Sequence, residues 1–405
     1  MKSQTRKTKP LRDSVLTHRA SRLRVTNPRP FSRVLISPGL LITCALLLWF
    51  TNWLGHRWLF ERATLLGNDV LLSVTKVGVA THFRVITVDA KEYADYLGEG
   101  MLPDKLSDVI AAILKYEPKV LAIDVDTSQP RFQQLHLPRT HSRMVWARVA
   151  RQEQITSDSH NKKRFQWVVG EVLGNRPDQP SYAGNPLFPQ DADWTVRGYQ
   201  RAISLADARV PSLHWEIVRA YCDAVQDQAC AKLRSRGLTA TDDVQDFVAD
   251  WDVPQTPLSD LMAEGGSAVP RPGALGDIVL LGASFGDIHP TPFGPKLGAE
   301  LIGAAVESEL AGVQFAHGDV DWSKWPIKIF LAIFIAWLNT RLAPVWAASS
   351  TLCLVLVIFV GSFLGTYYGI FRLEFVPFML GVWIEQLIEG TINAHHIAAA
   401  KVAAH

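Results

Sequence analysis

Apolar residues gather in four stretches of this 405-residue chain. One lies near the amino terminus, at residues 34–55, and three lie near the other end, at residues 325–341, 345–366 and 371–390. A helix needs roughly 20 apolar residues to cross the hydrocarbon core of a bilayer. The pattern therefore predicts one transmembrane helix before, and three after, a middle segment of mixed polarity at residues 56–322.

The middle segment opens with the pattern of a strand, a helix and a second strand. His82–Asp89 and Lys119–Asp126 each contain a short apolar run that is typical of a buried strand. Between them, Asp104–Tyr116 has apolar residues at the i, i+3, i+4 and i+7 positions of an amphipathic helix. A strand, a helix and a strand of these lengths form a βαβ unit, so the two strands should be parallel.

Further elements follow less regularly along the middle segment. Strands are predicted at Met144–Ala150, Phe165–Val172, Phe247–Val253 and Asp277–Leu281, and helices at Ser212–Arg234 and Ala299–Leu310. The stretch Pro254–Gly276 is rich in Pro and Gly, and we expect it to be irregular. The alternation of strands and helices predicts one α/β domain with a largely parallel sheet.

Charge orients the chain in the membrane. Residues 1–33 hold ten Lys and Arg and a single acid, Asp13. Because Lys and Arg collect on the cytoplasmic side, this basic arm and the tail at residues 391–405 should be cytoplasmic, with the domain outside. A cleaved signal peptide is the alternative, but no small-residue cleavage site follows Trp53. We expect a bacterial inner-membrane protein whose basic arm is a disordered topology signal, with contact to membrane lipid as the alternative and no binding of nucleic acid.

The four cysteines divide by location. Cys44 and Cys353 lie in predicted membrane spans, whereas Cys222 and Cys230 lie in the extracytoplasmic segment, where an oxidising compartment allows a disulfide. Eight residues of straight helix span about 12 Å, which is too far for a bridge. A disulfide would therefore require a helix end between them, near Asp227, and the sequence leaves the pairing open.

Several segments resemble the type-two CHASE domains, the extracytoplasmic sensory domains of bacterial cyclases and histidine kinases. The resemblance rests on the opening strands, the acidic-then-basic middle and the closing segment: Val85–Asp89, Val120–Asp124, Asp191 and Asp193 with Arg197, Ile278–Ala283, Asp287–Pro292, Gly294–Pro295 and Gly298–Glu300. One membrane helix before the domain and three after it is also the layout of that family. The resemblance implies a sensory role and names no stimulus.

The chain departs from the family pattern in three places. Gly98–Pro103 replaces the usual Trp-Pro-Arg-like turn, and Val125–Gln129 replaces an apolar-aromatic segment. No cyclase, kinase or phosphatase domain follows the last predicted span. We therefore expect a sensory protein that signals through a separate output partner. The alternative is a structural or assembly subunit of an envelope complex.

Acidic residues end the predicted parallel strands. Asp89 and Asp124 follow the first two strands, and open parallel sheets bind ligands at this carboxyl end. Asp126, Asp287 and His289 could join them from neighbouring loops. Carboxylates with a histidine suit a divalent cation, although the spacing matches no metal motif. The alternative is that Asp89 and Asp124 cap helices or brace loops.

A serine hydrolase is the third hypothesis. The string Gly282-Ala283-Ser284-Phe285-Gly286 satisfies Gly-x-Ser-x-Gly directly after a strand, with His289 nearby. A nucleophile elbow requires a helix straight after the turn, and Pro290 and Pro292 argue against one. We therefore expect no enzymatic activity and no cofactor.

Two features of the last spans concern helix packing. Gly361, Gly365 and Gly369 recur every four residues, a spacing that lets another helix approach closely, as in a homo-oligomer. Glu385 and Glu389 lie four residues apart near the inner end of the last span. Such carboxylates lie at the membrane interface or pair with a partner, because charge within hydrocarbon is costly.

Overall fold

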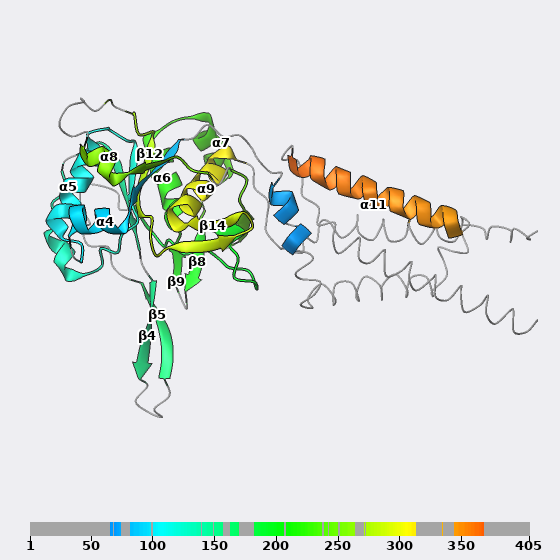
Figure 1. Cartoon of the computed structure of the whole chain (residues 1–405), viewed down its shortest axis with the longest axis horizontal. Coiled ribbons are helices and arrows are strands. Elements are labelled where there is room, and N and C mark those ends of the chain that lie inside the picture. Colours follow the sequence, from blue (N-terminus) through cyan, green and yellow to red (C-terminus); the bar gives the residue numbers. More distant parts are fainter. Residues whose placement is uncertain are drawn as a thin grey trace, which may run out of the picture.

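The computed structural model (Figure 1) describes the middle segment and one of the predicted spans. The described residues are 65–67, 69–73, 82–98, 100–138, 140–148, 150–156, 163–169, 182–205, 208–236, 239–241, 243–249, 252–263, 271, 273–312, 334 and 344–367. Four predicted segments lie outside the described residues: 1–33, 34–55, 371–390 and 391–405. Gly369, Glu385 and Glu389 also lie outside them. Of the predicted span at residues 325–341, only residue 334 is described.

Six parallel strands form the centre of the domain. Their order across the sheet is β11 (Gln255–Pro257), β1 (Phe83–Val88), β12 (Ile278–Ala283), β2 (Val120–Ile123), β3 (Arg143–Ala147) and β6 (Tyr182–Gly184). Every neighbouring pair runs parallel. The prediction of an α/β domain with a largely parallel sheet is confirmed.

The first two strands and the helix between them form the predicted βαβ unit. Helix α5 (Pro103–Leu114) begins with proline at its first position, where the missing N–H costs nothing. Its apolar stripe is buried at Leu106, Val109, Ile110 and Ile113. β1 and β2 are parallel but not adjacent, because β12 lies between them.

Helices cover both faces of the sheet, which explains why its strands are continuous apolar runs. Successive side chains of a strand point to opposite faces, so in β12 Leu280 and Leu281 belong to different cores. Helices α6 (Leu213–Ala224), α7 (Gln228–Arg236) and α9 (Gly298–Ala311) contribute to the core on one face. Helices α5 and α8 (Leu258–Ala263), with the π-helical turn Tyr93–Leu97, pack on the other. The result is a three-layer α/β/α domain (Figure 1).

Short elements and hairpins complete the described structure. The short helices are α4 (Ala90–Glu92) and a 3₁₀ helix at Pro130–Gln134. The antiparallel pairs are β4 (Ala150–Thr156) with β5 (Lys163–Val169), β7 (Gly198–Gln200) with β10 (Val244–Asp246), β8 (Ala202–Leu205) with β9 (Ala208–Pro211), and β13 (Ile288–Thr291) with β14 (Gly294–Leu297). In Figure 1 the β4–β5 hairpin projects away from the sheet.

Two predictions of secondary structure were wrong. The strand expected at Phe247–Val253 is instead β10, which ends at Asp246, and the Phe247 side chain is buried beyond it. The stretch Pro254–Gly276, expected to be irregular, contains β11 and α8. Leu258 and Leu261 of α8 are buried against the sheet, and β11 tolerates its proline because it is an edge strand.

Helix α11 (Pro344–Tyr367) runs through the predicted span at residues 345–366 and carries Gly361 and Gly365. Within the described part of the chain, no helix was found with the combined length and hydropathy that crossing a membrane requires. The four spans therefore stay a prediction.

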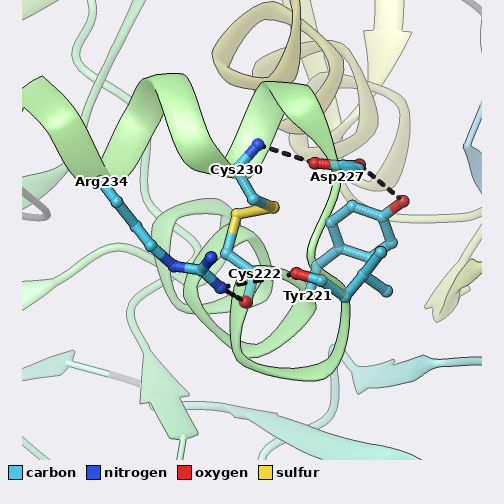
Figure 2. The surroundings of a disulfide bond; sticks show 6 residues. Tyr221, Cys222, Asp227, Cys230 and Arg234 are labelled. Carbon is cyan, nitrogen blue, oxygen red and sulfur yellow. Dashed lines mark hydrogen bonds between the residues drawn. A yellow bond between two sulfur atoms is a disulfide. The ribbon is translucent and has the colours of Figure 1, made fainter.

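A disulfide joins α6 to α7 (Figure 2). Helix α6 ends at Ala224 and α7 begins at Gln228, which is the break that pairing requires. Asp227 lies in the break, and its Oδ1 accepts a hydrogen bond from the Cys230 N–H at 2.7 Å. The Cα atoms of Cys222 and Cys230 are 5.1 Å apart, and both residues are fully buried. The pairing that the sequence left open is formed.

Replacing Cys222 and Cys230 together with serine should lower the free energy of unfolding by about 2–3 kcal/mol, because the bridge restricts the unfolded chain. Thermal unfolding of the detergent-purified full chain, followed by tryptophan fluorescence, measures the loss. Cys353→Ser is the control, because Cys353 is an exposed free cysteine on α11. Equal effects from the two changes would contradict the assignment.

Candidate functional site

The carboxyl ends of β1, β12 and β2 meet at one edge of the sheet, where the chain leaves toward opposite faces. After β1 it enters α4 and α5 on one face, and after β12 it enters the β13–β14 hairpin and then α9 on the other. In open parallel α/β sheets, ligands bind at the carboxyl ends of the strands, at the point where neighbouring connections leave toward opposite faces. This edge is where the sequence placed the candidate site.

The structure brings three of the five candidate residues together. Asp124 follows β2, and its carboxylate interacts electrostatically with Asp287 and His289, which come from the segment after β12. The Asp287 Oδ1 and the His289 Nε2 lie 2.9 Å apart. We name Asp124, Asp287 and His289 the acidic cluster.

Helix α9 begins against the acidic cluster. The Gly298 N–H, at the first position of α9, donates to the Asp287 carbonyl at 2.9 Å. A Cβ at Gly298 would overlap the Asp287 carboxylate, so glycine is what lets this carboxylate lie against the helix. The partial positive charge at the start of a helix stabilises a carboxylate placed there.

Asp124 has an unusual protonation equilibrium. Burial and the negative charge of Asp287 together raise its pKa to about 7, although His289 opposes the shift. Near neutral pH the cluster can therefore take up a proton. A positively charged ligand group would relieve the same repulsion between the two carboxylates.

Asp89 and Asp126 have local structural roles instead. The Asp89 Oδ1 accepts from the Glu92 N–H at 2.7 Å, and the Glu92 Oε2 accepts from the Asp89 N–H at 2.9 Å, which is a capping box for α4. The Asp126 Oδ1 accepts from the N–H of Ser128 at 3.0 Å and from its hydroxyl at 2.5 Å. The Asp-x-x-Glu spacing at residues 89–92 could have shown the cap in the sequence.

The Gly-x-Ser-x-Gly string forms a turn. The Ser284 N–H and hydroxyl both point to the Val88 carbonyl, at 2.9 and 3.3 Å. Gly286 has a φ of 78°, a left-handed conformation that suits glycine. The next element is strand β13, so the segment does not have the strand–turn–helix form of a nucleophile elbow. The described residues also contain no group of His, Cys, Asp and Glu suited to holding a metal ion.

Another group of charged residues surrounds Arg197, and only part of this group could be predicted from the sequence. The Arg197 side chain is 4 % exposed and makes ion pairs with Asp69, Asp191 and Asp193. Asp191, Asp193 and Arg197 are the acidic-then-basic segment of the CHASE resemblance, but Asp69 is 128 residues away along the chain. No sequence pattern could have identified that partner.

A family model described as the CHASE2 domain matches residues 41–343. The chain belongs to the CHASE2 family. This confirms the resemblance, and since CHASE2 domains are extracytoplasmic sensory domains, it supports a sensory role. No curated protein and no solved structure matches the chain. The matched region contains the whole six-stranded sheet, so the acidic cluster and the Arg197 ion pairs both belong to the CHASE2 domain.

Asp124→Asn should stabilise the CHASE2 domain at alkaline pH. An acid whose pKa is raised on folding contributes stability at low pH and loses it as the pH rises from its ordinary pKa of 3.8 to about 7. Asparagine cannot ionise, so its gain in the free energy of unfolding should be small at pH 5 and on the order of 1–3 kcal/mol at pH 8.

Thermal unfolding of the full chain at pH 5 and pH 8 measures this gain. Asp108→Asn is the matched control, because it removes one carboxylate from the exposed face of α5. The prediction is wrong if both variants raise the free energy of unfolding equally, or if the increase for Asp124→Asn does not grow with pH. Either result would show that ionisation of Asp124 does not destabilise the domain.

Proposed function

We propose that the chain is a sensory protein anchored in the bacterial inner membrane. Its CHASE2 domain at residues 56–322 lies outside the membrane, and the spans at residues 34–55, 325–341, 345–366 and 371–390 leave both termini in the cytoplasm. The apolar stretches and the basic arm support this arrangement. Helix α11 exposes several large apolar side chains: Trp346, Leu352, Leu356, Val357, Val360 and Leu364.

The disulfide supports an extracytoplasmic domain. Cys222 and Cys230 are joined, and structural disulfides form and persist in oxidising compartments. The cytoplasm keeps thiols reduced, so the bridge agrees with a domain on the outer side of the membrane.

The acidic cluster is the observation that carries the sensory proposal. It lies at the sheet edge where ligands bind in related architectures, and Asp124 and Asp287 repel each other there. A proton or a cationic group neutralises this repulsion, so it binds more tightly to the arrangement in which the carboxylates are close. Such differential affinity is what a ligand needs to shift a conformational equilibrium.

The output belongs to a separate protein in this proposal. The domain's conformational bias passes through the spans to a cytoplasmic or membrane partner, and we assign no catalytic role to this chain. A second candidate function is a structural subunit of an envelope assembly. It is favoured by Asp89 and Asp126, whose carboxylates serve as a helix cap and a turn brace.

Crosslinking in the native cells, followed by purification in detergent and identification of bound proteins, tests the proposal. We expect a cyclase, kinase or other signalling enzyme to accompany the chain. Asp124→Asn keeps position 124 uncharged at every pH, so it should change the activity of that enzyme in isolated membranes, whereas Asp108→Asn should not. Recovery of a multi-subunit envelope complex without a signalling enzyme would favour the structural role.

A further inference from the structure

One residue separates the acidic cluster from the loop that contains Arg197. His289 of the cluster lies on β13, and the next residue, Pro290, accepts a hydrogen bond through its carbonyl from the Val196 N–H at 2.9 Å. Arg197 follows Val196 directly. A displacement of β13 therefore acts on the backbone next to Arg197 without any intervening side chain.

The Arg197 guanidinium uses all of its hydrogen-bond donors. Its Nε and Nη2 bind the two oxygens of Asp69 at 2.6 and 3.1 Å. Its Nη1 and Nη2 bind the two oxygens of Asp193 at 2.8 Å each, and Nη1 also binds Asp191 at 3.0 Å. Paired charge-assisted bonds of this kind fix orientation as well as distance. Arg197 therefore holds Asp69 in one geometry relative to the loop.

Asp69 belongs to what we name the connecting segment, the helical residues 65–67 and 69–73. This segment precedes β1 and follows the predicted span at residues 34–55. Leu71 and Leu72 are buried, whereas Leu66 is 66 % exposed and Val70 is 42 % exposed. In Figure 1 the connecting segment lies between the domain and α11. It is the part of the domain that a signal must move to reach the first span.

The Arg197–Asp193 ion pair does not depend on pH in the range where Asp124 titrates. Hydrogen bonds from Arg197 lower the pKa of Asp193 to about 2, although burial opposes this shift. The charged groups that act on Asp124 are Asp287 and His289. The acidic cluster can therefore respond to a proton or cation while Arg197 stays paired with the charged Asp193.

We propose that Arg197 transmits movement of β13 to the connecting segment, and that the Asp69 ion pair is the link to the first membrane span. Arg197 is a positioning residue in this scheme, since it lies outside the acidic cluster. The proposal rests on the proposed sensory role of the cluster. The proposed route carries a change in the protonation or ligand occupancy of the acidic cluster to the first membrane span.

Hydrogen–deuterium exchange of the full chain in lipid nanodiscs tests the route, with the proton as the probe. Exchange is compared at pH 5 and pH 8 after correction for the intrinsic pH dependence of amide exchange. In the wild type we expect protection to change in both β13 and the connecting segment, by about tenfold in exchange rate. Asp124→Asn should abolish both changes.

Asp69→Asn and Asp191→Asn are the matched pair. Each substitution removes the negative charge of one carboxylate that binds the Arg197 guanidinium. Only Asp69 lies on the connecting segment. We expect Asp69→Asn to abolish the pH response of the connecting segment and to leave that of β13 intact. Asp191→Asn should retain both responses. If Asp69→Asn does not fold, Asp69→Glu replaces it, because it keeps the charge and changes the paired geometry.

The two proposals fail in different ways. If β13 in the wild type does not respond to pH, the acidic cluster is not a proton-sensing site. If β13 responds but the connecting segment does not, or if Asp69→Asn keeps the response of the connecting segment, the route through Arg197 is wrong. Loss of that response in both Asp69→Asn and Asp191→Asn would also overturn it, since it would reflect general loosening of the ion pairs.

Discussion

Insertion of β12 between β1 and β2 is the pairing on which the rest of the structure depends. β12 comes near the end of the domain, yet it pairs with the first two strands and completes the centre of the sheet. This pairing carries Asp287 and His289 to the end of β2, where Asp124 lies. It also starts α9 beneath the acidic cluster and packs it on β1 and β12. β12 is far from β1 and β2 along the chain, so pairing them costs loop-closure entropy. Burial of apolar side chains on both faces of the sheet must offset this cost.

Two buried carboxylates of α9, Glu307 and Glu309, also hold this helix in place against other parts of the domain. The Glu309 carboxylate, which is fully buried, accepts two hydrogen bonds from Arg201 at 2.8 Å each. Glu307, two residues before Glu309 in α9, accepts from the Phe83 N–H at 3.0 Å. Removing one partner of a buried pair costs about 3–5 kcal/mol because the other charge stays unpaired. The beginning of β1 and the end of α9 are therefore joined by polar contacts, so the two chain segments that lead out of the domain are held together.

Much of this fold was visible in the sequence, and the exceptions share a physical cause. The βαβ unit and β12 could be predicted because both faces of their strands are buried, which gives continuous apolar runs. β11 and the β13–β14 hairpin were missed because they contain prolines and lie outside the buried centre, where apolar periodicity is weak. Of the five candidate site residues, Asp124, Asp287 and His289 interact because strand ends of a parallel sheet meet at one edge, and their role in binding a ligand stays a prediction. The Asp69–Arg197 pair was invisible, because no local pattern encodes a contact across 128 residues.

Two carboxyl groups of the domain can change their protonation near neutral pH, and they lie in different surroundings. Burial raises the pKa of both Asp124 and Glu216 to about 7. Glu216 is buried within α6 and is paired with Arg219 at 2.8 Å, so a change in its charge acts mainly inside the helix layer. Asp124 instead follows β2 and interacts with Asp287 and His289, which come from the segment after β12. A change of its charge alters the repulsion between two segments that leave the sheet separately. Of these two carboxylates, Asp124 is therefore the one whose charge bears on the relative position of two elements, as the proposed sensory role requires.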